Sequence, residues 1–241
     1  MGKTEGQKLE EKLCFKPQHI AKERPEDLQK AMDFAEGYKT FLDHSKIERE
    51  CVAYSEELAK KAGYNTYWFS NQGRYGQFDS AITMVAKTAD VAEWTDDSYT
   101  FTTKFDESLL PYLTRIDPHA NNFIVLHLMG SHIYYNNRYP DEWAKFASAD
   151  GDSVMTSAPS YANSILYTDY ILSQIFSYAE KNLNLRAMVY FSDHGENLKI
   201  SHNPDVFRFD MVRIPFFIYL SPEYRAAFPR RTETLAARRE A

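Results

Sequence analysis

Apolar runs along the chain predict β-strands, and the stretches between them are polar or amphipathic. The run at 64–70 is rich in aromatic residues and ends at Asn71-Gln72-Gly73, a sequence typical of a turn. The run at 187–191 is uninterrupted, as in a buried strand. Four strands are predicted in this way, at residues 64–70, 122–129, 187–192 and Val212 with 214–220.

Helical patterns alternate with these runs. Residues 51–62 predict an amphipathic helix with Leu58 on its apolar side, and Gly63 ends that helix. Residues 79–88 and 159–182 are the other predicted helices. Strands that alternate with helices favour an α/β fold. We expect a three-layer α/β/α sandwich with a mostly parallel central sheet covered on both faces.

Composition divides the chain into three segments. Residues 1–50 are polar and charged, with helical patches and no strand signal. Residues 51–228 contain all the predicted strands and form the predicted globular domain. Residues 229–241 are a charged, Ala-rich tail, for which we expect a loose helix or disorder.

Composition and charge exclude some classes of protein. The 241 residues carry a net charge of −6, which gives no electrostatic footprint for binding nucleic acid. No window approaches the roughly 18 consecutive apolar residues of a membrane-spanning helix. The first residues are polar and do not resemble a signal peptide. Cys14 and Cys51 allow at most one internal disulfide.

Candidate chemistry begins where the strand at 187–192 ends. Asp193 and His194 follow it directly, and Gly195 lets the backbone turn sharply behind them. In open α/β sheets, ligands bind at the carboxyl ends of the strands. Carboxylate oxygen and imidazole nitrogen are ligands that Zn²⁺ accepts, so this pair is a candidate metal site.

Two more polar clusters follow in similar places. His132 comes just after the strand at 122–129, and His202 comes shortly after the Asp193–His194 pair. Parallel strands bring such ends to one edge of a sheet, so these side chains are expected to converge. A metal with nearby imidazoles suits phosphoryl or sulfuryl transfer, because it neutralises charge while imidazoles bind oxygens or protonate the leaving group.

Simpler interpretations of the same residues stay open. His127 lies within an apolar run, which favours a core histidine with a satisfied hydrogen bond. Asp193 could cap a helix beside a surface histidine, and His132 and His202 could be turn or loop residues. Asp169 on the predicted long helix is expected to be solvated or to support the site indirectly.

Four stretches resemble motifs of the sulfatase-like phosphoethanolamine transferases, in the alkaline phosphatase superfamily. Ser192–Leu198 is similar to the family's "SDHGESL". The stretch from His127 to His132, followed by Arg138-Tyr139-Pro140, is similar to "H-x-x-G-S-H … R-Y-P". Asn163–Asp169 resembles the "D-N-x-I-x-Y-T-D" helix, and Ala62–Gln72 resembles "AGY-x-T-x-W-x-SNQ". The resemblance covers residues 51–228, and its motifs occur in the family's order.

The resemblance implies a Zn²⁺ enzyme that forms a phospho-enzyme. Asp193 and His194 would be metal ligands, and His132 and His202 would bind the phosphate or a second zinc. Phosphoethanolamine would pass from phosphatidylethanolamine to a lipopolysaccharide (lipid A or core) or other glycan acceptor. The family's catalytic domain faces the periplasm and is anchored in the inner membrane, so residues 51–228 would be a portion of that domain.

The sequence departs from the family in its N-terminal part. The family's Thr nucleophile, its Glu zinc ligand and its membrane helices are not found, so we expect a sheet incomplete on its N-terminal side. Two ligands are fewer than a catalytic zinc site uses, which predicts weak zinc binding and negligible transferase activity for this chain alone. Two alternatives remain, a sulfatase or phosphodiesterase hydrolase and a non-catalytic truncated remnant.

Overall fold

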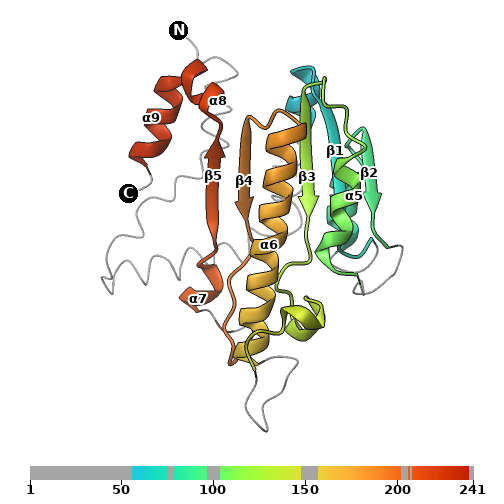
Figure 1. The fold of residues 1–241 in the computed structure, drawn as a ribbon, viewed down its shortest axis with the longest axis vertical. Helices are drawn as coiled ribbons and strands as arrows, with labels where there is room; N and C mark the ends of the chain where they lie inside the picture. The colour runs from blue at the N-terminus through green and yellow to red at the C-terminus, as the bar shows by residue number, and fades with distance from the viewer. Residues whose placement is uncertain are drawn as a thin grey trace.

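The computed structural model describes residues 56–74, 79–96, 104–147, 157–201, 206 and 208–238. Two groups of strands form its sheet layer (Figure 1). Three parallel strands pair in the order β2-β1-β3, and β4 pairs antiparallel with β5. The strands are β1 (Asn65–Ser70), β2 (Val91–Trp94), β3 (Asn122–His127), β4 (Ala187–Phe191) and β5 (Phe216–Leu220).

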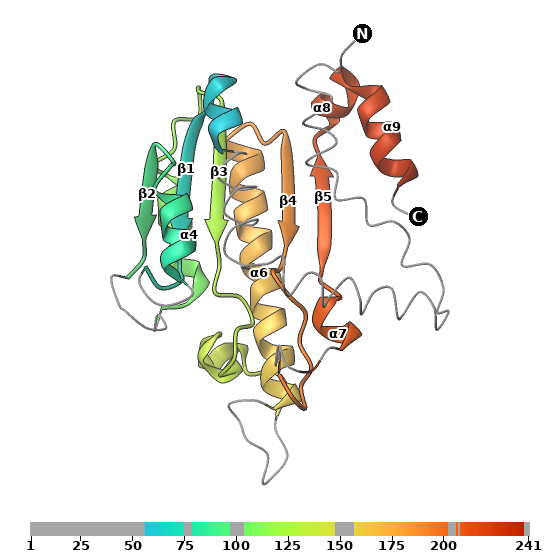
Figure 2. The same ribbon diagram turned by 180° about the vertical axis from the view of Figure 1, so that it is seen from behind.

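Helices cover both faces of this layer. In the ribbon views α5 and α6 lie on one face, and α4 lies on the other (Figures 1 and 2). The predicted three-layer α/β/α architecture is therefore confirmed. The helices are residues 56–61, α4 (Asp79–Ala86), α5 (Leu110–Leu113), α6 (Ala158–Asn182), α7 (Phe209–Val212), α8 (Pro222–Ala227) and α9 (Pro229–Ala237), with 3₁₀ turns η1 (Asp106–Leu109), η2 (Tyr135–Asn137) and η3 (Asp141–Trp143).

The alternation of side chains along β1 builds a core on each face. Phe69 is 1% exposed and packs with residues of α5 and α6, whereas Trp68 packs with Val85 and Ala86 of α4 on the other face. Burying an aromatic side chain of this size contributes roughly 2–3 kcal/mol before entropy is counted. A strand that is apolar on both faces must lie inside the sheet, and β1 does.

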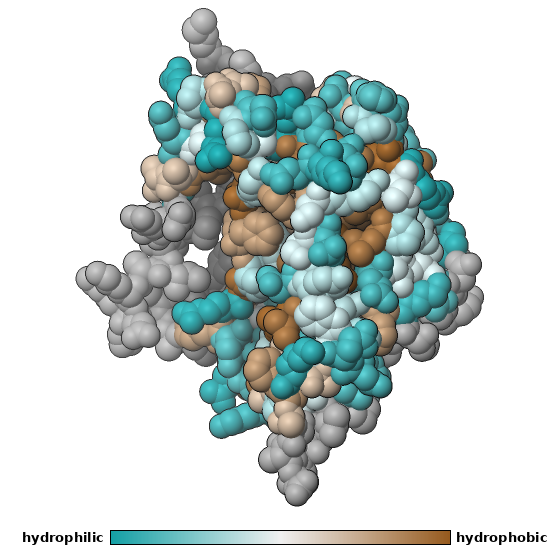
Figure 3. Space-filling view, viewed as in Figure 1, coloured by the Kyte–Doolittle hydropathy of each residue, from teal (hydrophilic) through white to brown (hydrophobic). Residues whose placement is uncertain are grey.

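The long helix α6 explains how the two groups of strands stay together. Ser157 caps its first turn, where the Ser157 hydroxyl accepts from the Ser160 amide at 3.3 Å. Tyr167, Ile171 and Ile175 recur every four residues and form its buried stripe in the main core, which Met188 of β4 also contacts. Beside α6, hydrophobic surface remains visible over β4 and β5 (Figure 3).

The structure corrects several predicted boundaries. The second predicted strand ends at His127, because the amides of Met129 and Gly130 donate to the Asp106 carboxylate instead of a neighbouring strand. The last strand begins at Phe216, and Val212 lies in α7.

Other elements differ from the sequence prediction as well. The four-residue strand β2 was not predicted. Leu58, which was expected on the covered face of its helix, is 38% exposed. The tail is helical to Ala237. Residues 1–50, with Cys14, and also Cys51 and His202 lie outside the described residues. No helix in the described part of the chain is long and apolar enough to cross a membrane.

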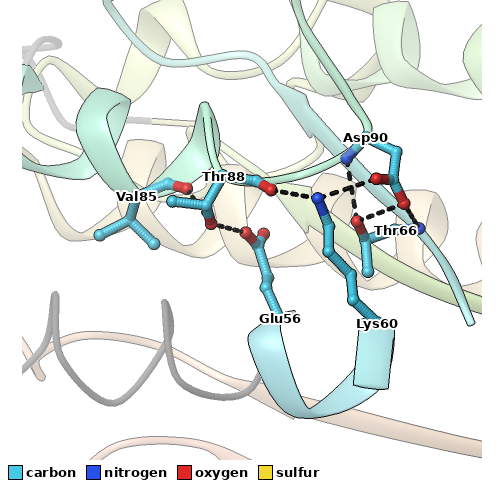
Figure 4. A network of polar contacts seen from close by, with 6 residues as sticks. All are labelled: Glu56, Lys60, Thr66, Val85, Thr88 and Asp90. Carbon is cyan, nitrogen blue, oxygen red and sulfur yellow. Dashed lines mark hydrogen bonds and ion pairs between the residues drawn. The ribbon is translucent and has the colours of Figure 1, made fainter. Parts of the chain in front are cut away.

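A polar network fastens the helix at 56–61 to the sheet (Figure 4). Lys60 Nζ lies 2.8 Å from Asp90 Oδ1 and donates to the Thr88 carbonyl oxygen at 2.6 Å. Asp90 Oδ2 accepts from both the amide and the hydroxyl of Thr66 at 2.9 Å. Glu56 accepts from the Thr88 hydroxyl, and burial raises the pKa of its carboxyl.

Asp90 gives this network a pH dependence. The hydrogen bond from Lys60, followed by that from the Thr66 amide, lowers the pKa of the Asp90 carboxyl to about 2, from an ordinary 3.8. The ionised carboxylate therefore stabilises the fold above its ordinary pKa. That contribution is lost as the pH falls from about 4 to about 2.

We expect Asp90→Asn to lower the free energy of unfolding by about 0.5–1 kcal/mol at neutral pH, because the ion pair is partly exposed and screened by solvent. The difference from wild type should shrink between about pH 4 and about pH 2. Urea unfolding followed by tryptophan fluorescence measures both. Asp169→Asn, an exposed carboxyl on α6, is the control. A difference that stays constant through this pH range would contradict the assignment.

Candidate functional site

The carboxyl ends of β1 and β3 are joined by the side chains that follow β1. Ser70 Oγ lies 3.1 Å from Nδ1 of His127, and Gln72 Nε2 donates to the Leu128 carbonyl oxygen at 2.6 Å. The Asn71 amide donates to the His127 carbonyl oxygen at 2.9 Å. The Ser-Asn-Gln stretch therefore fixes the end of β3, from which the loop carrying His132 departs.

His127, the last residue of β3, is half-buried and held by a hydrogen bond. Its ring hydrogen-bonds with Ser70 and meets the Trp68 ring edge-on, with centroids 5.7 Å apart. The ring keeps some accessible surface, yet desolvation by the surrounding protein lowers the pKa of His127 to about 4. The negative charge of Asp193 opposes that shift, so the loop after β4 faces the end of β3. The predicted hydrogen bond of His127 is therefore present, but the residue is half-buried instead of lying in the core.

His132 lies in the loop between β3 and η2, and buried Arg138 holds that loop. Arg138 is 5% exposed, and its guanidinium donates to the carbonyl oxygens of His132 at 3.3 Å and Ile133 at 3.1 Å. Burial lowers the pKa of Arg138, and the charge of Asp106 opposes this. The Arg-Tyr-Pro motif therefore supports the backbone of the His132 loop.

The Asp193–His194 loop begins where β4 ends. The Asp193 side chain is 77% exposed, and its Oδ1 lies 3.8 Å from Nε2 of His194. Asp193 Oδ1 also accepts from the His194 amide at 3.0 Å. Nδ1 of His194 lies 2.7 Å from the Gly195 carbonyl oxygen. Two donor atoms of the kinds that bind zinc thus lie side by side at the sheet edge.

Gly195 brings this loop against α7. Its amide donates to the Met211 carbonyl oxygen at 2.6 Å. A Cβ at this position would lie 2.0 Å from the Asp210 carbonyl oxygen and 2.6 Å from that of Arg213. Only glycine permits so close an approach of two backbones, so the turn behind the Asp-His pair is fixed by packing.

Glu196 connects the same loop to η2. Its carboxylate accepts a hydrogen bond from the Tyr135 hydroxyl and also lies near Tyr161. Burial, followed by the charge of Glu196, raises the pKa of Tyr135. The rings of Tyr135 and Tyr161 meet with centroids 5.0 Å apart. The sequence analysis did not predict this contact, although Glu196 belongs to the Ser192–Leu198 motif.

The predicted site residues are only partly brought together. Asp193 and His194 are adjacent, and Asp193 lies near the end of β3. Within the described ranges, no three His, Cys, Asp or Glu side chains are placed to hold one metal ion. His202 lies outside those ranges.

The remaining motif residues are structural. Asn163 Oδ1 accepts from the Lys145 and Phe146 amides at 2.9 Å, and Asn163 Nδ2 donates to the Tyr139 hydroxyl at 3.3 Å. Asp169 on α6 is exposed, as expected for a solvated carboxylate. These motifs therefore tie α6 to the segment that follows the His132 loop.

A family model described as Sulfatase matches residues 56–238. The chain belongs to the sulfatase family. Several of its curated relatives are named phosphoethanolamine transferase, the family that the four motifs predicted. This chain is 29% identical over 192 residues to phosphoethanolamine transferase EptC of Escherichia coli (strain K12), and the match covers 72% of this chain and 33% of that protein. It is 34% identical over 143 residues to phosphoethanolamine transferase OpgE of the same strain, covering 57% and 26%.

Solved structures agree with the sequence relatives. The zinc complex of the C-terminal periplasmic domain of EcEptC from Escherichia coli is 29% identical, with a TM-score of 0.63, over 72% of this chain and 54% of that one. The corresponding EptC domain from Campylobacter jejuni is 25% identical, with a TM-score of 0.53, over 69% and 56%. The sulfatase-like fold is thereby confirmed. The chain spans about a third of the length of curated relatives such as EptC.

The Gly195 contact generates a stability prediction. We expect Gly195→Ala to lower the free energy of unfolding by about 3 kcal/mol, because α7 must move to admit the methyl group. Gly63→Ala is the matched control, since a Cβ there meets nothing within 4 Å and only the positive φ of 82° opposes it. The control should cost about 1 kcal/mol. Equal losses in urea unfolding would show that the close approach to α7 is not decisive.

Proposed function

We propose that this chain carries part of the active site of a zinc-dependent phosphoethanolamine transferase, with Asp193 and His194 as metal ligands. The observation that carries the proposal is the placement of these two side chains, 3.8 Å apart at the carboxyl end of β4. The family and its named relatives support the reaction class. The zinc complex of the EcEptC domain supports the choice of metal.

The donor atoms fit zinc. A carbonyl oxygen can only accept, so the contact with the Gly195 carbonyl oxygen requires the proton on Nδ1 of His194. Nε2 therefore keeps its lone pair for a metal, and the backbone fixes the tautomer, as in many zinc sites. Two ligands of one tetrahedral zinc ion lie roughly 3.4 Å apart, given metal–ligand distances of about 2.0–2.2 Å. The observed separation of 3.8 Å is close to that value.

The other predicted residues would act on the phosphate. Bound zinc would neutralise developing charge and lower the pKa of an attacking oxygen. We assign His132 and His202 to phosphate binding or proton transfer. His127 remains neutral down to about pH 4, so it is assigned no charge-bearing role near the phosphate. Transfer through a phospho-enzyme is part of the proposal, and its nucleophile is not identified in this chain.

Substrates and location follow from the same proposal. Phosphatidylethanolamine would be the donor, and a lipopolysaccharide (lipid A or core) or other glycan hydroxyl would be the acceptor. The solved EcEptC domain is described as periplasmic, which supports a periplasmic active site at the inner membrane. A hydroxyl-bearing acceptor, in place of water, is what distinguishes this transferase from a hydrolase of the same family.

Zinc titration tests the metal assignment. We expect the wild-type chain to bind zinc with a dissociation constant above about 1 µM, because Asp193 and His194 supply only two ligands. Asp193→Asn and His194→Ala should each weaken binding about tenfold or more. Isothermal titration calorimetry with zinc alone measures this.

Asp169→Asn serves as the control for these variants, because it removes an exposed carboxyl of α6. It should leave the zinc affinity unchanged. Unchanged affinity in both Asp193→Asn and His194→Ala would remove the basis of the metal site. Tight zinc binding by the wild-type chain, with turnover of a phosphatidylethanolamine analogue, would contradict the two-ligand account.

A further inference from the structure

Asp106 is a buried carboxylate to which sequence reasoning assigned no role. It opens the 3₁₀ turn η1 and is 5% exposed. Asp106 Oδ1 accepts from Asn71 Nδ2 at 2.8 Å and from the Met129 amide at 2.9 Å. Asp106 Oδ2 accepts from the Gly130 amide at 2.8 Å. N–H groups thus point at both oxygens, an arrangement that suits an acceptor-only carboxylate.

These hydrogen bonds shape the loop that leads to His132. The amides of Met129 and Gly130 leave the sheet pattern and turn toward Asp106, and Gly130 adopts a left-handed φ of 57°. His132 follows two residues later. On the far side of that histidine, Arg138 holds the carbonyl oxygens of His132 and Ile133. The backbone is therefore held on both sides of His132 along the chain.

The carboxylate is itself anchored to the sheet. Asn71 is fully buried at the end of β1, and its Nδ2 also donates to the Lys104 carbonyl oxygen at 3.1 Å. The Thr95 hydroxyl donates to Asn71 Oδ1 at 2.5 Å, and the Thr95 amide donates to the Ser70 carbonyl oxygen at 2.9 Å. The ends of β1 and β2 thus form the frame on which Asp106 rests.

A charged group in this place requires a reason beyond packing. Burying a carboxylate costs several kcal/mol unless oriented donors and a nearby cation compensate. Here three N–H groups and the charge of Arg138 supply that compensation. An apolar residue would fill the same volume without this cost, but it would leave the amides of Met129 and Gly130 unsatisfied and the loop undefined.

We propose that Asp106 is a positioning residue that sets the His132 imidazole for phosphate binding, through the amides of Met129 and Gly130. This inference rests on the proposed function, because it takes His132 as a phosphate-binding group. Asp106 does not touch substrate in this account. It acts on His132 alone and leaves the Asp193–His194 pair of β4 unaffected, which separates its effect from that of a metal ligand.

Asp106→Asn tests the proposal with little change in volume. The amide keeps one accepting oxygen but turns an NH₂ group toward one of the backbone amides, where a donor meets a donor. The probe is phosphoethanolamine, titrated into the metal-free chain while NMR follows the His132 ring. We expect its dissociation constant to rise roughly tenfold or more. Zinc affinity, measured separately, should stay within about twofold of wild type, because the β4 loop keeps its own contacts.

Asp141→Asn, an exposed acidic residue at the start of η3, is the matched control and should change neither affinity. A parallel fall of zinc and phosphoethanolamine affinity in Asp106→Asn would mean that Asp106 only maintains the fold, which overturns the proposal. An unchanged phosphoethanolamine affinity in a folded variant would overturn it too.

Amide hydrogen exchange keeps the inference testable if the wild-type chain binds no phosphoethanolamine. In that case the phosphate-binding role of His132 in the proposed function fails. Asp106→Asn should nevertheless speed exchange selectively in residues 128–133 and leave residues 193–196 at the wild-type rate. If exchange in residues 128–133 also stays at the wild-type rate, the positioning role of Asp106 is wrong independently of any ligand.

Discussion

The buried Asp106 carboxylate accepts three hydrogen bonds, and the arrangement of the strand ends near His132 depends on them. Two of the donors are backbone amides just beyond β3, and the third is the side chain that follows β1. Burial raises the pKa of this carboxyl, while the same hydrogen bonds and Arg138 oppose the shift. Removing any partner would leave charge or amides buried without compensation, so the strand ends and the loop form one unit.

The sequence was sufficient for the parts of the fold that depend on apolar runs. The runs at 64–70, 122–129 and 187–192 became β1, β3 and β4. β1 is apolar on both faces because a core covers each of them. The prediction of a buried strand at 187–191 is wrong, because Val189 and Phe191 of β4 are 52% and 59% exposed. The sequence failed where another contact takes over. The four residues of β2 are too short to signal a strand alone, and Val212 continues an apolar run but lies in a helical turn.

The site divides in the same way. The Asp193–His194 pair could be predicted because a carboxylate and an imidazole directly follow an apolar run that forms a strand, and the two residues are neighbours in the chain. The role of Asp106 could not be predicted from the sequence, because its partners lie 23 to 35 residues away. Two of those partners are backbone amides, which carry no sequence signal. Whether His132 meets the pair depends on loop geometry, which periodicity does not encode.

The division of the strands into two sheets has a consequence for the behaviour of the protein in solution. Among the described residues, β3 hydrogen-bonds only to β1 and β4 only to β5. Each therefore presents a row of backbone donors and acceptors along one side, and α6 packs against both groups of strands. An unpaired strand edge is a template with which another extended chain can pair. Pairing of another chain with either edge would therefore depend on the protein concentration.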